Sequence, residues 1–304
     1  MANSYYFDSF DGKKIFVREW IPQNAPIGVI QIIHGMVEHS GRYEKFANYL
    51  SSQGYLVFAD DHRAHGNTDK ETLGFCKGDI WADTLTDIGL LNQKYRAKYP
   101  NVKYVIFGHS YGSFLLQSYL QQADPYVFDG VILSGSAKMQ GVQIVAGRVV
   151  ASLGKPSSPA NAIKKMSFDA YDKCFQKGTF ISSLEKECQI YKEDSHCGFV
   201  CSNNFYKCFF GGLKGIYSQK RLKAIDKDIP ILIVSGESDP VGNFGKSTKK
   251  LYETYLSCGV KNVTLRLFKG NRHEVLNDVS ALEACSLICD FANSVIKRKN
   301  GKEQ

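Results

Sequence analysis

A serine stands between two glycines where an apolar run gives way to an amphipathic one, in the segment YVIFGHSYGSFLLQSYL (residues 104–120). The five letters GHSYG centre on Ser110 and fit the pattern G-x-S-x-G, with an expected strand before and an expected helix after. That context is typical of a nucleophilic serine on a sharp strand-to-helix turn. A helix-capping serine is the plainer interpretation, and the strand-turn-helix context favours the nucleophile over it.

A serine hydroxyl is a weak nucleophile, so it needs a base, a group that holds the base, and donors for an oxyanion. Two histidines follow Ser110 in the chain, His196 and His273. His273, in FKGNRHEVLND, comes directly after an expected strand, at the sheet edge where ligands of open α/β sheets bind. We therefore predict His273 as the base, against the alternative of a polar loop histidine.

The acid that orients the base should also follow a strand, and ILIVSGESDPVG offers Glu237 and Asp239. Glu237 is closer to the strand. Asp239 precedes a proline, which holds it extended and away from the helix that follows. We prefer Asp239, with Glu237 as the alternative, to hold the tautomer of His273 and stabilise its protonated form.

Two backbone N–H groups are expected to form the oxyanion hole. The first belongs to Tyr111, the residue after the serine, and the second to a loop that follows an earlier strand. The stretch IQIIHGMVEHSGRY supplies that loop, and Met36 is the expected second donor. Its side chain could equally be a core-filling thioether, which does not conflict with a backbone role.

Histidine and cysteine gather in two further places without a convincing metal pattern. His62 and His65 stand near carboxylates in ADDHRAHGNTD, but no third ligand is suitably spaced, so we expect this loop to brace the floor of the site. Nine cysteines occur, and a C-x₂-C pair is absent from their cluster beside His196. We expect buried thiols, no metal and no cofactor. The clustered cysteines are Cys174, Cys188, Cys197, Cys201 and Cys208.

Short β-branched runs alternate with longer amphipathic runs, which predicts a mostly parallel sheet with helices on both faces, an α/β fold. The expected strands are 14–20, 28–35, 55–61, 102–108, 129–136, 229–236 and 262–268, and the expected helices are 41–54, 81–100, 113–124, 246–259 and 280–298.

This rhythm stops between residues 136 and 227, which is too long for a plain loop. We expect this part, here called the cap segment, to be an inserted helical lid, with a core of residues 1–135 and 228–304. Its most apolar piece, GVQIVAGRVVASLG, has valines at helical spacing. Val145 and Val149 are our candidates for substrate contact there, against the alternative that they pack in the core of the cap.

The composition is that of an ordinary globular protein, with 304 residues, 43% hydrophobic residues and a net charge of +8. No basic stripe with interleaved aromatics occurs, so we expect no nucleic-acid partner. A transient contact with a membrane surface fits the mild basic excess better. The N-terminus lacks an apolar signal region and no run of about 18 apolar residues occurs, so with its unpaired cysteines we expect a cytoplasmic protein.

With these residues placed, the sequence resembles the monoacylglycerol lipase and lysophospholipase group of α/β hydrolases, the serine aminopeptidase-like hydrolases. The resemblance covers about residues 6–136 and 229–304, and it rests on HGMVEHSGRY, ADDHRAHGNT, GHSYGS, SGESDPVG and NRHEVLND in the order of the family. It implies an α/β-hydrolase fold, a triad of Ser110, Asp239 and His273, and oxyanion donors at Met36 and Tyr111. It also decides for Asp239 over Glu237.

Two departures from the group are visible. Ala64 stands in RAHGNT where the group usually has glycine, so we expect a strained turn there. The cap segment matches the group only in position and helical character.

The resemblance implies hydrolysis of single-chain lipid esters, such as monoacylglycerols or lysophospholipids, through an acyl-enzyme. An aminopeptidase of the proline-iminopeptidase type is the alternative, for which a cap carboxylate would bind the substrate amine. A non-catalytic ligand-binding protein on the same fold is a further alternative, which the intact triad disfavours. The candidate cap carboxylates are Glu185, Glu187, Glu193 and Asp194.

Overall fold

The computed structural model describes residues 2–122 and 127–298, which form a mostly parallel sheet of eight strands in the order β1-β2-β4-β3-β5-β6-β7-β8. The first three strands in this order pair antiparallel, and the remaining neighbours pair parallel. The predicted α/β-hydrolase fold is therefore confirmed. The strands are β1 (Asn3–Asp8), β2 (Lys14–Trp20), β3 (Gly28–Ile33), β4 (Tyr55–Asp60), β5 (Lys103–His109), β6 (Gly130–Ser134), β7 (Ile231–Gly236) and β8 (Val263–Phe268).

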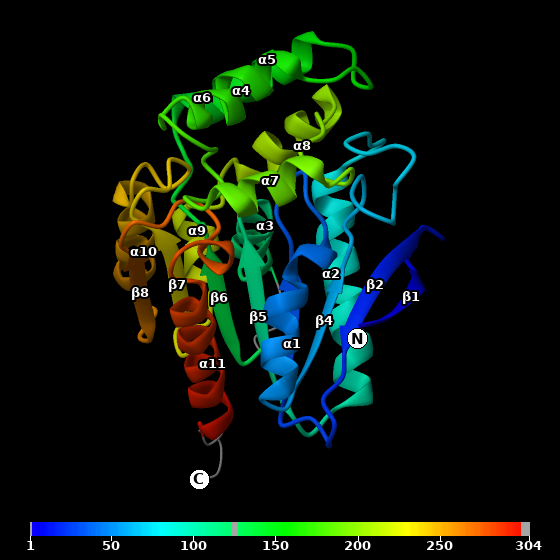
Figure 1. Cartoon of the computed structure of the whole chain (residues 1–304), viewed down its shortest axis with the longest axis vertical. Helices are drawn as coiled ribbons and strands as arrows, with labels where there is room; N and C mark the ends of the chain where they lie inside the picture. Colours follow the sequence, from blue (N-terminus) through cyan, green and yellow to red (C-terminus); the bar gives the residue numbers. More distant parts are fainter. Residues whose placement is uncertain (1, 123–126, 299–304) are drawn as a thin grey trace.

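Helices cover both faces of the sheet, as Figure 1 shows. Side chains of β5 alternate between the two cores: Tyr104 and Ile106 join one, and Val105 and Phe107 join the other. Strand β5 is thus buried on both faces, which explains its near-continuous apolar run. One face carries α1 (Glu44–Ser52) and α11 (Ala281–Lys297), and the other carries α2 (Ile80–Lys98), α3 (Tyr111–Tyr119) and α10 (Lys246–Ser257).

All seven predicted strands and all five predicted core helices are present, with ends shifted by a few residues. The helix predicted over 113–124 ends at Tyr119, and its last two predicted residues lie outside the described part of the chain. Strand β1 was not predicted. It lies at the edge of the sheet with four of its six residues exposed, so it lacks the apolar pattern of a buried strand.

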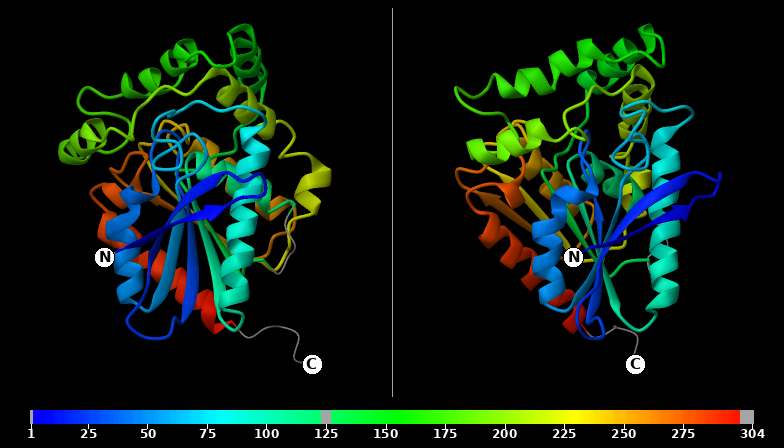
Figure 2. Two further views of the ribbon diagram at one scale, coloured as in Figure 1. Left: turned by 90° about the vertical axis from the view of Figure 1, so that its right-hand side faces the viewer. Right: turned by 45° about the vertical axis from the view of Figure 1, so that its right-hand side comes forward.

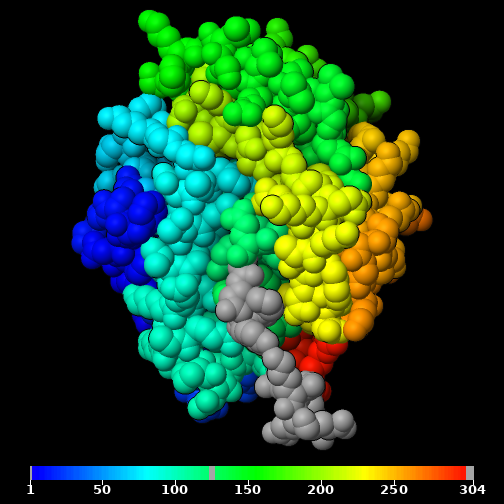
Figure 3. Space-filling view, turned by 180° about the vertical axis from the view of Figure 1, so that it is seen from behind, coloured from blue at the N-terminus to red at the C-terminus, as the bar shows by residue number. Residues whose placement is uncertain are grey.

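The cap segment follows β6 and returns to the sheet at β7, and most of it lies over the carboxyl ends of the strands (Figures 1 and 2). Viewed from behind, it forms a layer over one end of the molecule, while its last part runs down the flank of the core (Figure 3). There, Leu222 and Ile225 join the sheet core, and Arg221 donates to Ser118 Oγ at 2.9 Å. The helices are α4 (Val142–Leu153), α5 (Asn161–Met166), α6 (Phe168–Asp172), α7 (Glu185–Glu193), α8 (Asn203–Leu213) and α9 (Gln219–Lys223).

Within the described residues, none of the helices combines the length and the apolar character that crossing a membrane requires.

Candidate active site

Ser110 lies at the turn between β5 and α3 with a backbone that L-residues rarely adopt, at φ 50° and ψ −118°. Its neighbours leave no room for side chains. A Cβ at Gly108 would lie 2.7 Å from the carbonyl oxygen of Gly112, and a Cβ at Gly112 would collide with the carbonyl oxygen of Ile33. The two glycines therefore permit the sharp turn that lifts Ser110 to the carboxyl edge of the sheet.

His273 and Asp239 meet at the same edge, from the loops after β8 and β7. His273 Nδ1 lies 3.0 Å from Asp239 Oδ2, and both side chains are buried. The carboxylate also accepts from Ser235 Oγ and from the backbone N–H of Val241, each at 2.9 Å. Glu237 is exposed to solvent. The structure thus brings Asp239 to the histidine and leaves Glu237 outside.

The charges of His273 and Asp239 shift the pKa of each other. Burial alone would lower the pKa of His273, but the negative charge of Asp239 and the hydrogen bond to it outweigh burial and raise that pKa above the ordinary value. Burial opposes ionisation of Asp239, yet His273 and its other donors hold the pKa of the carboxyl below its usual range. Asp239 is therefore a permanent anion at neutral pH, able to hold His273 and stabilise its protonated form.

Ser110 and His273 line one cleft together with Met36 and Tyr111. A Cβ at Gly35 would lie 3.2 Å from Cβ of Ser110, so the loop that carries Met36 passes directly beside the serine. Within the described part of the chain, the backbone N–H groups of Met36 and Tyr111 have no protein acceptor. Both groups lie beside Ser110, where hydrogen-bond donors to an oxyanion are needed.

Two buried histidines hold this loop from behind. His65 Nε2 accepts the backbone N–H of Val37 at 3.1 Å, while its Nδ1 donates to the carbonyl oxygen of Arg63 at 2.9 Å. His34 Nε2 accepts the N–H of His62 at 2.9 Å. Burial lowers the pKa of His65 to about 3, so the ring stays neutral and keeps its acceptor atom. The predicted bracing role of the ADDHRAHGNTD loop is the role the structure shows.

The same loop contains Ala64, which stands where the family usually has glycine. Its φ is +65°, in the left-handed region that favours glycine. Arg63 anchors the turn through charge-assisted bonds to Asp87 at 2.7 Å and Asp11 at 2.6 Å. Asp61 accepts the backbone N–H of Ser40 at 2.8 Å. These bonds keep the turn in place although a left-handed alanine costs about 1 kcal/mol or more.

One functional feature escaped the sequence reasoning. Arg42 lies between Glu38 and Glu274, bonded to the first at 3.0 Å and to the second at 2.8 Å, and all three side chains are buried. Burial opposes ionisation of Glu274, but Arg42 lowers its pKa, whereas for Glu38 burial prevails and raises the pKa. Both carboxylates line the cleft beside His273. The i,i+4 spacing of Glu38 and Arg42 is the sequence feature that could have revealed this ion pair.

Away from these carboxylates the cleft is apolar and aromatic, with an empty volume of about 750 Å³, part of it open to solvent. A second hollow shares six of its lining residues, so the two adjoin. The shared residues are Met139, Ile163, Ser167, Tyr171, Phe210 and Val241.

The two cap valines singled out from the sequence do not line the cleft or the adjoining hollow. Val145 and Val149 are 59% and 54% exposed, and Ile144 and Val150 of the same helix face the hollow instead. The helix α4 thus presents one apolar face inward and another to solvent.

The cap carboxylates named for the peptidase alternative also lie elsewhere. None of the four lines the cleft within the described residues. Asp194 bonds His39 at 2.9 Å, Glu187 bonds Lys45 at 3.1 Å, and Glu185 is exposed.

A doubly covered α/β sheet, a strained serine at a strand-to-helix turn and a buried histidine–aspartate pair together define an α/β hydrolase of the serine hydrolase class. The profile of the family described as "Serine aminopeptidase, S33" matches residues 24–280, and the chain belongs to this family.

Curated relatives agree with this class. The chain is 26% identical to monoglyceride lipase of Mus musculus, over 86% of this chain and 80% of that protein. It is also 26% identical to monoacylglycerol lipase of Mycolicibacterium smegmatis, over 91% of both chains. Family and relatives together make this chain an ester-cleaving hydrolase.

Solved structures are similar over almost the whole chain. A structure titled "Lipase (Open form)" has a TM-score of 0.88 and 25% identity, covering 98% of this chain and 100% of that one. A carboxyl esterase from Bacillus coagulans has a TM-score of 0.88 at 24% identity, covering 97% and 99%. The second likeness supports the fold.

Proposed function

We propose that the protein hydrolyses carboxylic esters of single-chain lipids, such as monoacylglycerols or lysophospholipids, through an acyl-enzyme on Ser110. The observation that carries the proposal is the cleft, because it leads from Ser110 into an apolar, aromatic space that continues into a second hollow. Such a space suits one acyl chain. The names of the relatives, monoglyceride and monoacylglycerol lipase, support the same substrate class.

In this proposal, His273 Nε2 takes the proton of Ser110 as the serine oxygen bonds to the ester carbonyl carbon. His273 then gives that proton to the leaving alcohol as the acyl-enzyme forms. A water molecule next loses a proton to His273 and attacks the acyl carbon, and the proton returns to Ser110 as the fatty acid leaves. The N–H groups of Met36 and Tyr111 would stabilise the oxyanion in both halves.

The polar and the aromatic parts of the lining suit the two parts of the ester. Glu38 and Glu274 are polar groups beside His273, which fits a hydroxylated leaving group. Aromatic side chains of α8 in the cap segment, such as Phe209 and Tyr206, also line the cleft. This polarity would place the ester carbonyl at Ser110 with the chain directed toward the cap segment.

We propose that residues 136–227 act as a lid on a core of residues 1–135 and 228–304. Helices α4, α5 and α6 contribute to the cleft or its adjoining hollow, so movement of these helices would change access to Ser110. The packing of Leu222 and Ile225 against the core suggests that the last part of the segment acts as a fixed hinge.

The outward face of α4 supports a transient membrane contact. Val142 and Leu153 are each 82% exposed, and with Val145 and Val149 they form an apolar strip along the helix. Burying such a strip in a lipid surface yields about 25 cal/mol per Å², which suffices for weak, reversible attachment. A cytoplasmic location is proposed on the nine cysteines, all within the described residues and all unpaired.

A substrate panel tests the proposal. p-Nitrophenyl esters of increasing acyl length are assayed beside aminoacyl anilides, with monoacylglycerol and lysophospholipid as natural-type substrates. We expect ester cleavage with kcat/KM rising with chain length, and little anilide cleavage. Preferred cleavage of the anilides would instead establish the aminopeptidase alternative, and no cleavage of either would establish the non-catalytic one.

A further inference from the structure

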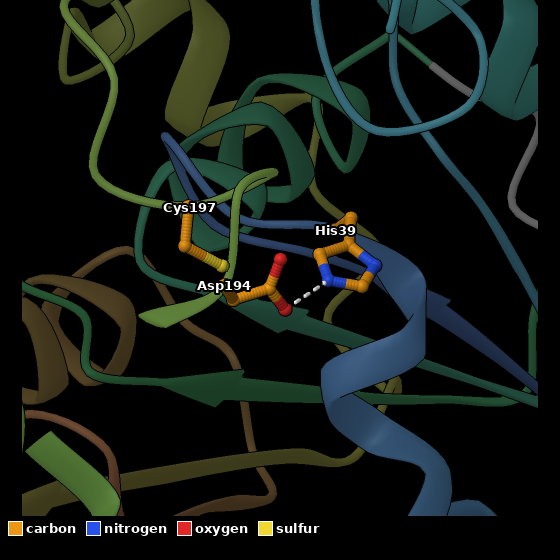
Figure 4. A group of neighbouring side chains, drawn as sticks. All are labelled: His39, Asp194 and Cys197. Atoms are coloured by element: carbon orange, nitrogen blue, oxygen red, sulfur yellow. Dashed lines mark hydrogen bonds and ion pairs between the residues drawn. The ribbon is translucent and has the colours of Figure 1, made fainter. Parts of the chain in front are cut away.

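An imidazole, a carboxylate and a thiol meet next to the cleft without lining it (Figure 4). His39 comes from the loop after β3, and Asp194 and Cys197 come from the turn after α7. His39 Nε2 lies 2.9 Å from Asp194 Oδ2, and ligand atoms of all three residues lie within 4.8 Å of one another. Their side chains take no part in the hydrolysis described above.

We propose that His39, Asp194 and Cys197 form a binding site for a borderline-soft divalent cation such as Zn²⁺. Zinc takes nitrogen, oxygen and sulfur ligands at about 2.0–2.3 Å in tetrahedral geometry, which sets neighbouring ligand atoms roughly 3.3–3.6 Å apart. A separation of 4.8 Å must therefore shorten by roughly 1.2–1.5 Å, and the 2.9 Å contact between His39 and Asp194 must lengthen by about 0.5 Å, which side-chain rotation can supply. One aspartate and one thiolate would neutralise the charge of the ion.

A fourth ligand lies within reach. His196 Nδ1 is 3.8 Å from Asp194 Oδ1, and the rings of His196 and His39 lie 5.5 Å apart. Water can fill the same position if His196 stays where it is.

Backbone hydrogen bonds already hold the three side chains together. The N–H of Cys197 donates to the carbonyl oxygen of Asp194 at 3.0 Å, which closes the turn that carries both ligands. The N–H of Gly198 and the hydroxyl of Tyr191 both donate to the carbonyl oxygen of Val37, at 3.0 and 3.1 Å. The turn is thus tied to the loop of His39, so little order remains to be created when an ion binds.

The positive charge that acts on Cys197, that of Arg42, does not oppose the site. Arg42 stacks over the ring of Tyr191 at 4.8 Å, but its charge is offset by two buried carboxylates, Glu38 and Glu274. Burial raises the pKa of Cys197, so the free protein holds a neutral thiol there. The free site therefore has one anion, Asp194, and a thiol that an ion can ionise.

With a neutral His39, the hydrogen bonds give the proton balance of binding. His39 Nδ1 accepts the N–H of Gly41 at 3.2 Å, so the ring proton lies on Nε2 and points to Asp194. An ion at Nε2 sends that proton to Nδ1, and the bond from Gly41 is given up. The thiol proton of Cys197 leaves to solvent as the metal–sulfur bond forms. Binding thus releases one proton per ion and weakens as the pH falls.

The site would join the loop that carries Met36 to the cap segment. An ion there would crosslink the core and the lid, and it would stabilise the folded chain.

Cobalt spectroscopy on the tag-free, EDTA-treated full chain tests the site. We expect Co²⁺ to give a near-ultraviolet thiolate-to-cobalt charge-transfer band that saturates at one ion per chain, and Zn²⁺ to remove it by displacement. Cys197→Ser should lose the band. The matched control Cys174→Ser, at an exposed cysteine, should keep it. Zinc should also raise the melting temperature of the unmodified chain but not of Cys197→Ser.

A band that is absent from the unmodified chain, or unchanged in Cys197→Ser, overturns the proposal. If Cys197→Ser does not fold by circular dichroism, His39→Gln replaces it. The Zn²⁺ affinity measured by calorimetry should then fall by at least the roughly 10–100-fold that loss of an outer-shell partner causes. An unchanged affinity in folded His39→Gln also overturns it. These readouts do not depend on ester hydrolysis, so they stand apart from the proposed function.

Discussion

The protonation state of His273 determines the pH range in which the triad is active. A general base must be neutral, and Asp239 raises the pKa of His273 above the ordinary 6.5 against the effect of burial. We therefore expect kcat/KM on a soluble ester to rise with pH through this raised pKa and to be lost in acid. Asp239→Asn removes the charge that raises the pKa, so the midpoint of its residual activity should move to lower pH. The pH–rate profiles of both proteins check this, and a midpoint unmoved by the substitution would contradict it.

The same aspartate should matter far more for rate than its neighbour. Asp239→Asn leaves a group of similar shape but favours the wrong tautomer of His273, so we expect kcat to fall by roughly 10³–10⁴-fold. Glu237→Gln is the matched control, because Glu237 is exposed and lies in the same loop. It should change kcat less than about tenfold. Steady-state kinetics on one ester measure kcat of both variants. A larger loss of kcat in Glu237→Gln than in Asp239→Asn would make Glu237 the orienting acid.

At the scale of elements, the turn between β5 and α3 depends on the absence of a Cβ at Gly112. Gly112→Ala places a methyl group against the carbonyl oxygen of Ile33 in a closely packed core. We expect the free energy of unfolding to drop by roughly 3 kcal/mol or more, as for other overpacked sites.

Gly211→Ala provides the comparison for that substitution. Gly211 lies within α8, and the nearest atoms to an added Cβ belong to the flexible side chain of Arg148 at 3.9 Å. Alanine should therefore stabilise the chain by about 0.5–1 kcal/mol through helix propensity. Urea unfolding of both variants measures the difference, and equal stabilities would show that the turn is not sterically constrained.

Helix α4 lies between the hollow that adjoins the cleft and the outer surface. Val149→Asp adds a charge to the apolar strip at a residue that does not line the cleft. We expect turnover of long-chain esters presented in vesicles to fall several-fold, with butyrate esters nearly unaffected. Leu282→Asp, at an 85% exposed position on α11, should leave both unaffected. Equal loss on short and long esters, with a lower melting temperature, would assign Val149 to the core of the cap instead.

At the scale of the whole molecule, the parts that sequence could predict are those that local patterns determine. Strands buried on both faces leave continuous apolar runs, and the serine turn needs its two glycines, so the sheet and the position of Ser110 followed from short segments. His273 and Asp239 followed because each comes directly after a strand whose carboxyl end lies at the same sheet edge.

What escaped prediction depends on contacts between distant segments. Arg42 and Glu274 are 232 positions apart, and His39 and Asp194 are 155 apart, so no spacing rule connects them. Edge strand β1 lacks a buried face. The orientation of α4 was open for a related reason. Its apolar arc is wide enough to pack inward and to face solvent, and packing against α8 and α5 buries Ile144 and Ala151.

Covalent labelling of Ser110 tests the mechanism most directly. A fluorophosphonate should add one adduct to the chain, which peptide mass spectrometry should locate on Ser110. Ser110→Ala should lose both the adduct and roughly four or more decades of kcat, with its melting temperature nearly unchanged because one small side chain replaces another. A labelled or active Ser110→Ala protein, or an adduct on another residue, would contradict the acyl-enzyme mechanism.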